Sequence, residues 1–177
     1  MTSPRYPAAS IALHWLMLLL LVGVYAAIEL HDAFPDGSPA YERLETLHFM
    51  LGLSVLLLVL VRLSLRARFT APPVSPTPPA WQRTTARIVH GLLYALMLGM
   101  PIGGWLMLSA KGEAVPFFGL TLPPLVAPDE HLAHLIEEVH ETVGVAGYWL
   151  IGLHALAALA HHYIVRDDTL RRMLPGR

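Results

Sequence analysis

The chain has 177 residues, of which 55% are hydrophobic and only 14% charged, whereas an ordinary globular domain has about a quarter charged. With its net charge of -1, this composition excludes a nucleic-acid binder, a disordered protein and a water-soluble enzyme with an ordinary core. The sequence has ten histidines and no cysteine, which excludes disulfides, iron–sulfur clusters, thiolate zinc sites and covalently attached haem.

Four stretches contain no Asp, Glu, Lys or Arg: residues 6–28, 46–61, 88–110 and 142–165. Each is close to the roughly 20 apolar residues that cross a bilayer. They predict an all-α fold, an integral membrane four-helix bundle that forms one domain over residues 1–177. The helices are expected to span the bilayer at roughly 9–29, 46–65, 88–109 and 140–165.

The first span has an alternative interpretation as a cleaved signal peptide, because Arg5 precedes an apolar run and Ala26 and Ala27 are small. The run is longer than a usual signal core, however, and it contains His14 and Trp15. We therefore retain it as a membrane helix.

The second span is short, but Arg62 and Arg66 can extend their stems and place their charges at the interface. The proline-rich segment 69–82 is predicted to be an extended linker. In the third span, Pro101 lies among glycines, which predicts a kink and a close helix approach.

An outer loop is predicted over residues 110–139. Its prolines exclude a continuous helix over 114–128, and its aromatic residues are expected to lie against lipid headgroups or to cap the bundle.

The cations give the orientation, because ten of the twelve fall on one side of the four spans. Only Arg43 and Lys111 fall on the other side, together with 11 of the 13 acids. Both termini are therefore predicted to be cytoplasmic, with Arg177 among the inner cations.

Four histidines within or at the edges of the spans form two pairs at matching depths, and an intramembrane histidine is a functional hypothesis by default. His140 and His154 share one face of the fourth helix, about 21 Å apart. His48 and His140 lie at the same depth, at the outer edge of their spans. The depths of His14 and His154 agree to within one helical turn.

Two such pairs are what two non-covalent haems need, each iron bound by an imidazole on both axial sides. The alternatives are hydrogen bonds between helices, or a zinc site, for which four ligands would have to converge at one depth. His90 matches His154 less well in depth, so its role stays open between an interfacial position and a contact at a cofactor edge.

His161 lies seven residues beyond His154 and is a candidate proton donor to a quinone at the inner side. The alternative is that His161 and His162 anchor the helix end at the interface. Trp81 and Tyr163 are interpreted first as interfacial aromatics and second as walls of a quinone cleft.

Several short motifs in this order resemble the bacterial cytochrome b561 family nearly from end to end. They are Ser10 to Trp15 around His14, Leu47-His48 followed by Gly52 and Arg62, His140-Glu141-Thr142, Ile151 to Ala155 around His154, Ala160 to Tyr163, Phe118 to Pro123, and Asp168 to Pro175. Within that family the chain is most similar to the superoxide oxidases of the inner membrane.

This resemblance implies two b haems, one held by His14 and His154 and the other by His48 and His140, with a quinone site near His161. It implies that superoxide on the periplasmic side gives electrons to the outer haem and that ubiquinone is reduced at the inner one. No protein partner is required. The outer face is acidic, so Lys111 is the better candidate to attract superoxide, and Arg43 the lesser one.

Two other functions stay open. The family also contains electron-transfer subunits that serve a periplasmic dehydrogenase or other donor. A haem-free transporter or scaffold is the third possibility.

Overall fold

The computed structural model describes residues 5–175, so Arg177 lies outside the described part of the chain. It contains four long helices, α1 (Ala8–His31), α2 (Pro39–Arg68), α3 (Ala80–Lys111) and α4 (Glu130–Ala160). Each is long and apolar enough to cross a membrane. The predicted helical membrane bundle is confirmed.

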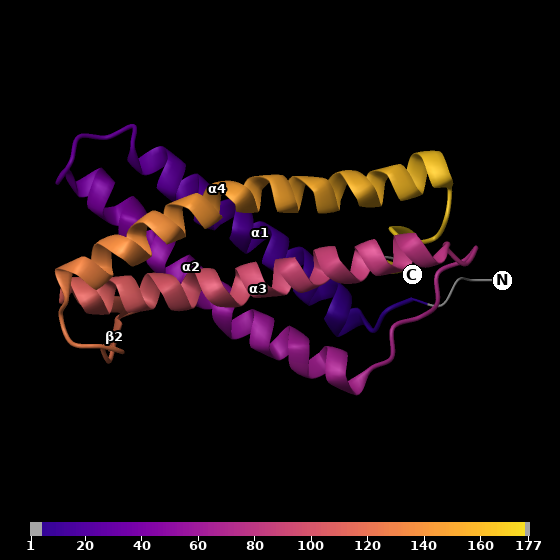
Figure 1. Cartoon of the computed structure of the whole chain (residues 1–177), viewed down its shortest axis with the longest axis horizontal. Coiled ribbons are helices and arrows are strands. Elements are labelled where there is room, and N and C mark those ends of the chain that lie inside the picture. Colours follow the sequence, from indigo (N-terminus) through magenta and orange to yellow (C-terminus); the bar gives the residue numbers. More distant parts are fainter. Residues whose placement is uncertain (1–4, 176–177) are drawn as a thin grey trace.

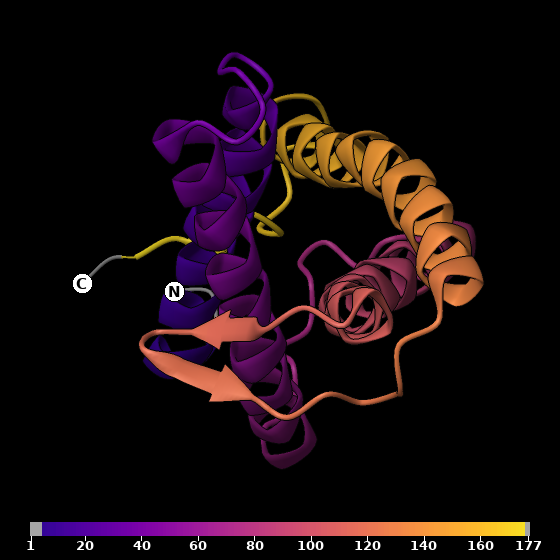
Figure 2. The ribbon, with the colours of Figure 1, turned by 90° about the vertical axis from the view of Figure 1, so that its left-hand side faces the viewer.

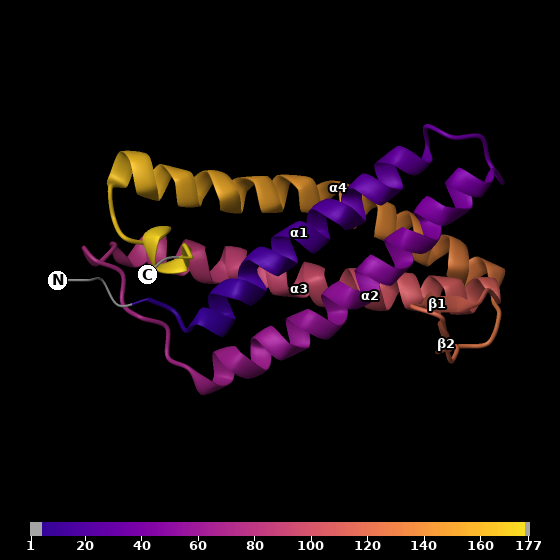
Figure 3. The same cartoon turned by 180° about the vertical axis from the view of Figure 1, so that it is seen from behind.

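The helices form two antiparallel pairs that cross each other (Figure 1). α1 lies against α2 and α3 against α4, and α2 also contacts α3. The view along the bundle in Figure 2 shows α4 curving past α1. The view from behind in Figure 3 shows the α1 and α2 pair crossing in front of the other pair. Residues far apart in the sequence are thereby brought together between the pairs.

Each helix extends beyond its charge-free run, because local signals in the flanking polar segments start and end it. Ser38 accepts a hydrogen bond from the Tyr41 amide at the start of α2, where Pro39 is the first helical residue. Asp129 caps α4 in the same way, and Gly112 ends α3 with a positive φ. α4 therefore begins at Glu130, and the segment before it is shorter than the predicted outer loop over 110–139.

One further detail differs from the sequence prediction. The linker after α2 ends at Pro79 rather than at residue 82, because the residues that follow already form the first turn of α3. α3 continues through Pro101 as one helix. Neighbouring helices in a membrane supply the packing that tolerates an internal proline.

The segment between α3 and α4 contains a small hairpin, β1 (Val115–Phe117) and β2 (Leu120–Leu122). Phe118 and Gly119 both have positive φ at the turn, as the two-residue turns of hairpins require. Val115 is buried against Leu53 of α2 and Leu108 of α3, so the hairpin closes this end of the bundle. We call it the hairpin end.

The opposite end is closed by a clasp, which we define as residues 166–174 held on the proline-rich linker and the start of α1. Asp168 accepts from the Ser75 amide at 2.9 Å and forms an ion pair with Arg172 at 3.4 Å. Arg172 also donates to the carbonyl of Pro72, and Trp15 Nε1 donates to the carbonyl of Met173 at 2.7 Å. Three of the five charged residues of the clasp, Asp167, Asp168 and Arg172, are buried.

Candidate functional site

The structure brings the four span histidines together as two pairs. The ring centres of His48 from α2 and His140 from α4 are 6.3 Å apart. Those of His14 from α1 and His154 from α4 are 6.2 Å apart. The first pair lies towards the hairpin end and the second towards the clasp end.

Both spacings fit a metal ion between two imidazoles. Metal–imidazole bonds of about 2.0–2.1 Å, with about 1.1 Å from nitrogen to ring centre, separate two axial ring centres by roughly 6.2 Å. Among the described residues, no group of three or more His, Asp or Glu side chains is placed to hold a metal. An ion at either pair would take its further ligands from outside these side chains, as the iron of a haem does from its macrocycle.

The hydrogen bonding of His48 also fits this role. Its Nδ1 lies 3.0 Å from the carbonyl oxygen of Val24, to which it must donate. This bond fixes the tautomer and leaves the Nε2 lone pair free for a metal.

The Nδ1 of His140 is buried, and residues 5–175 offer it no hydrogen-bond partner. Its ring lies over two glycines of α3. A Cβ at Gly103 would be 3.6 Å from Nδ1, and one at Gly104 would be 3.4 Å from Cε1. These glycines let α3 approach the imidazole closely, as the sequence predicted for this part of the helix.

A cavity of about 620 Å³ surrounds the pair formed by His48 and His140, which we call the outer pair. Its volume lies within the roughly 300–1,000 Å³ typical of ligand sites. Side chains of all four helices line it, and its mouth at the hairpin end carries polar groups. Gly52 lines it one turn after His48, and a Cβ there would meet nothing within 4 Å. The cavity therefore offers space beside the pair.

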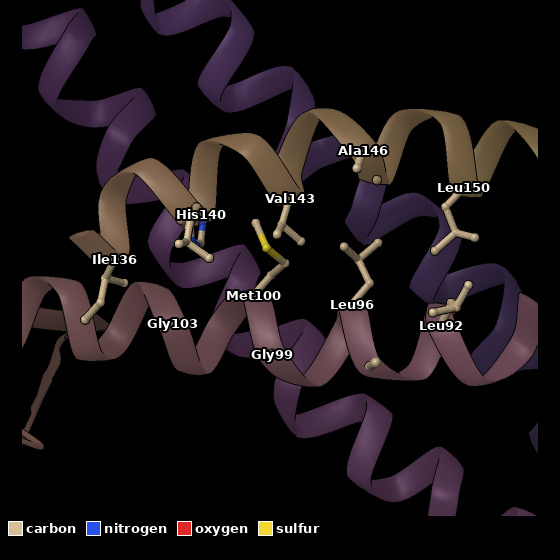
Figure 4. Close-up of a pocket in the computed structure, with 13 residues that line it drawn as sticks. Leu92, Leu96, Gly99, Met100, Gly103, Ile136, His140, Val143, Ala146 and Leu150 are labelled. Atoms are coloured by element: carbon tan, nitrogen blue, oxygen red, sulfur yellow. The ribbon is translucent and has the colours of Figure 1, made fainter. Parts of the chain in front are cut away.

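The ring of His140 also borders a second, almost wholly apolar cavity of about 540 Å³ between α3 and α4. Figure 4 shows the imidazole pointing from α4 towards α3, beside Met100 and Val143. The ring of His140 thus lies between the larger cavity and this second, apolar cavity.

His90 of α3 lies beside the pair formed by His14 and His154, which we call the inner pair. Its ring centre is 5.4 Å from that of His154. This spacing is shorter than the roughly 6.2 Å that two imidazoles on opposite sides of one ion require. Geometry therefore favours His14 as the partner of His154, with His90 beside them.

Lys111 lines the mouth of the outer cavity, as expected of a residue that attracts an anion. Its ammonium nitrogen, however, lies 2.7 Å from a carboxylate oxygen of Glu137 on α4. The cation that the sequence singled out is thus neutralised by an acid 26 residues away in the chain, which no local motif reveals.

His161 begins a π-helical turn, η1 (His161–Val165), that ends α4, and such turns are frequent at functional sites. Its Nδ1 lies 2.6 Å from Oδ2 of Asp167. The sequence did not predict this partner, because Asp167 lies beyond the helix end. The left-handed conformation of Arg166 (φ 61°) turns the chain so that Asp167 faces His161.

Burial would raise the pKa of Asp167, but the hydrogen bonds from His161 and Thr169 outweigh it and hold the pKa below its ordinary value. Asp167 is therefore a stable carboxylate at neutral pH.

The chain matches the family model described as prokaryotic cytochrome b561 over residues 5–176. It is 40% identical to cytochrome b561 homolog 1 of Escherichia coli, over 98% of both chains. It is 34% identical to the probable superoxide oxidase CybB of Yersinia pestis, over 98% of this chain and 97% of that one. Cytochrome b562 of Cereibacter sphaeroides is 30% identical, over 98% of both chains.

Proposed function

Because the chain belongs to the prokaryotic cytochrome b561 family, a family of haem b electron-transport proteins in bacterial membranes, we propose that it is a di-haem superoxide:ubiquinone oxidoreductase. In this proposal superoxide is oxidised at the hairpin end, which faces the periplasm. Ubiquinone is reduced at the clasp end, which faces the cytoplasm together with both termini of this inner-membrane protein.

The observation that carries the proposal is the pair of histidine spacings, 6.3 Å and 6.2 Å, at two depths of one bundle. His48 and His140 would hold one haem, and His14 and His154 the other. When bound, the haems supply one-electron transfer through the apolar interior.

The protein itself supplies four things. The histidines fix the ligand identity, and the carbonyl of Val24 fixes the tautomer of His48. The apolar helix surfaces keep water out of the interior. At the clasp end His161 is placed to deliver a proton to the quinone. At the hairpin end a polar mouth, in which Lys111 lies among several carboxylates, opens into the cavity beside His48 and His140.

The choice of superoxide as donor is supported by the resemblance to a relative named as a probable superoxide oxidase. The test is rapid mixing of the oxidised, purified protein with superoxide, followed by ubiquinone. We expect reduction of the haem absorption bands and then their reoxidation. An unchanged haem spectrum after superoxide would exclude this donor.

A second function is favoured by one observation, the ion pair that neutralises Lys111. An electron-transfer cytochrome b subunit, which passes electrons from a periplasmic dehydrogenase or another donor to the quinone pool, needs no free cation to attract superoxide. A stoichiometric partner that co-purifies with the protein and reduces its haems would support this alternative.

The optical spectrum and the haem-to-protein ratio provide the first measurement. We expect two haems per chain. A colourless preparation would exclude both functions and support a haem-free membrane protein.

A further inference from the structure

His161 is held by a carboxylate that is more deeply buried than the histidine itself. The Asp167 side chain is only 2% exposed and that of His161 is 23% exposed. The second carboxylate oxygen of Asp167 accepts from the Thr169 amide at 2.9 Å. Both oxygens are therefore engaged, one of them with the imidazole.

The backbone fixes the same geometry. The Asp167 amide donates to the carbonyl of His161 at 3.1 Å, so the two residues are joined through backbone and side chain. The next residue, Asp168, is bonded to Ser75 of the linker through both its amide and its carboxylate. The His161 carbonyl and the Thr169 amide thus hold Asp167 against His161, while the bonds to Ser75 fix the residue that follows.

This arrangement distinguishes the two nitrogens of the imidazole. Nδ1 donates to Asp167, so Nε2 is the nitrogen that remains for another partner. A carboxylate at Nδ1 orients the ring and stabilises the imidazolium, in which Nε2 carries a proton.

We propose that Asp167 is a positioning residue for quinone reduction, which holds His161 so that the proton on Nε2 is delivered to a quinone oxygen at the clasp end. The inference rests on the proposed function. Asp167 itself touches no substrate and acts only through His161.

The step balances as follows. Two superoxide anions are each oxidised to dioxygen, and their two electrons reduce one quinone. As an O–H bond forms on the quinone, the Nε2–H bond of His161 breaks. The neutral imidazole keeps the proton on Nδ1, which still donates it in a hydrogen bond to Asp167. Nε2 then takes up a new proton from water at the clasp end. The second quinone oxygen receives its proton in the same way.

The test uses the purified holoprotein with chemically reduced haems, mixed rapidly with a soluble ubiquinone analogue. For Asp167→Asn we expect the rate of haem oxidation at saturating quinone to fall about tenfold or more, since general acids contribute about 10²–10⁴-fold. The quinone concentration that gives half the maximal rate should change less than about twofold. Reduction of the haems by superoxide should be unaffected.

Asp168→Asn is the matched control. It removes the negative charge of a neighbouring buried carboxylate and thereby its ion pair with Arg172, but it leaves the contact with His161 in place. We expect its maximal rate to stay within about twofold of wild type. An equal loss in both variants would mean that Asp167 only stabilises the clasp, and would overturn the inference.

A double-mutant cycle adds a second criterion. If Asp167 acts through His161, Asp167→Asn should cause no further loss in a protein that already carries His161→Gln. An additional loss of the same size would overturn the inference. Should Asp167→Asn fail to bind haem, Asp167→Glu replaces it, with an expected loss of about threefold because the carboxylate is displaced by one methylene; a wild-type rate would then contradict the inference.

A spectroscopic readout is independent of turnover. In ¹⁵N-histidine-labelled holoprotein, the His161 signal, assigned by its loss in His161→Gln, should show a protonated Nδ1. This signature should change in Asp167→Asn and persist in Asp168→Asn. An unchanged signature in Asp167→Asn would overturn the inference, whereas wild-type haems that quinone does not oxidise would overturn the proposed function itself.

Discussion

At the scale of single residues, what matters is the partner of each imidazole nitrogen. His48 has a carbonyl at Nδ1, His161 has a carboxylate, and the Nδ1 of His140 has no partner among the described residues. Because an acceptor at Nδ1 fixes which ring nitrogen carries the proton, the three histidines differ in the nitrogen that they can offer to another partner. The sequence predicted the histidines from their depths, but it could not predict these partners, which come from other helices or from beyond a helix end.

The two proposed haem sites can be separated by single substitutions. We expect His48→Ala or His140→Ala to lose one haem and His14→Ala or His154→Ala to lose the other, because an iron that loses an axial imidazole is held by only one side of the bundle. The haem-to-protein ratio should fall from two to about one.

His90→Ala is the matched control for these variants. Its ring contacts that of His154 but lies too close to it for an intervening iron, so the variant should keep both haems. Full haem content in all four ligand variants, or haem loss in His90→Ala, would contradict the assignment.

The ion pair between Lys111 and Glu137 makes a second residue-level prediction. Glu137→Gln leaves the Lys111 cation unpaired at the mouth of the outer cavity. We therefore expect it to speed the reduction of the haems by superoxide by about two- to fivefold at low ionic strength. At about 0.5 M salt the gain should largely disappear, because screening is then strong.

Glu138→Gln is the control for this experiment, since it removes the same charge from the next residue, which lies 3.6 Å from His134 instead of Lys111. It should give a smaller gain. An equal gain in both variants would show that only the overall charge of the acidic face matters.

The lowered pKa of Asp167 predicts a pH effect on stability. A carboxyl whose pKa is depressed in the folded protein stabilises it fully above the ordinary pKa of about 3.9, and this contribution is lost as the pH falls through the lower, folded value. The thermal midpoint of the wild type should therefore exceed that of Asp167→Asn at pH 6, and the two should converge on strong acidification. A difference that stays constant down to pH 3 would contradict this origin.

At the scale of elements, the sequence predicted the cores of the helices better than their ends. Charge-free runs locate the segments that cross the bilayer, but a helix continues into polar residues until a cap stops it, as Asp129 and Gly112 show. The hairpin was missed because its turn is formed by Phe118 and Gly119, which is not one of the usual turn pairs. The clasp was missed because its stability depends on Ser75 and Pro72, about a hundred residues earlier in the chain.

The contact between α1 and α4 predicts a difference between two glycines of α4. A Cβ at Gly147 would clash with the hydroxyl oxygen of Tyr25, which donates to the carbonyl of Gly144 at 2.9 Å. Gly147→Ala must displace this tyrosine, so we expect a loss of about 1–3 kcal/mol, measured as a lower thermal midpoint in detergent.

Gly152 lies on the same helix, and a Cβ there would meet nothing within 4 Å. Gly152→Ala should be neutral or stabilising by up to about 1 kcal/mol, since alanine favours a helix over glycine. If both substitutions change the thermal midpoint equally, the contact between Gly147 and Tyr25 does not determine the stability of the protein.

At the scale of the whole molecule, the two ends of the bundle differ both in charge and in the structure that closes them. The acidic segments and the hairpin lie at one end, and most of the arginines lie at the other, where the clasp is. The sequence predicted two depths for the histidines from this polarity. By pairing His140 with His48 and His154 with His14, it also predicted that α4 faces both α1 and α2, but it gave no information on how the two helix pairs cross (Figure 2).

The proposed orientation can be tested directly because the chain has no cysteine. Phe118→Cys at the hairpin turn and Trp81→Cys near the linker introduce single thiols at exposed positions. A membrane-impermeant maleimide should label the first in spheroplasts and the second only in inverted vesicles. The reverse pattern would place the clasp end in the periplasm.

The clasp also has a consequence for biosynthesis. Trp15 near the start of α1 is bonded to Met173, so the first helix is fixed by a segment that is synthesised after all four helices. The helices can enter the bilayer as they are made, but this end of the bundle closes only after residues 166–174 have left the ribosome. A protein truncated at residue 165 should therefore be inserted and yet left open to proteolysis at the clasp end.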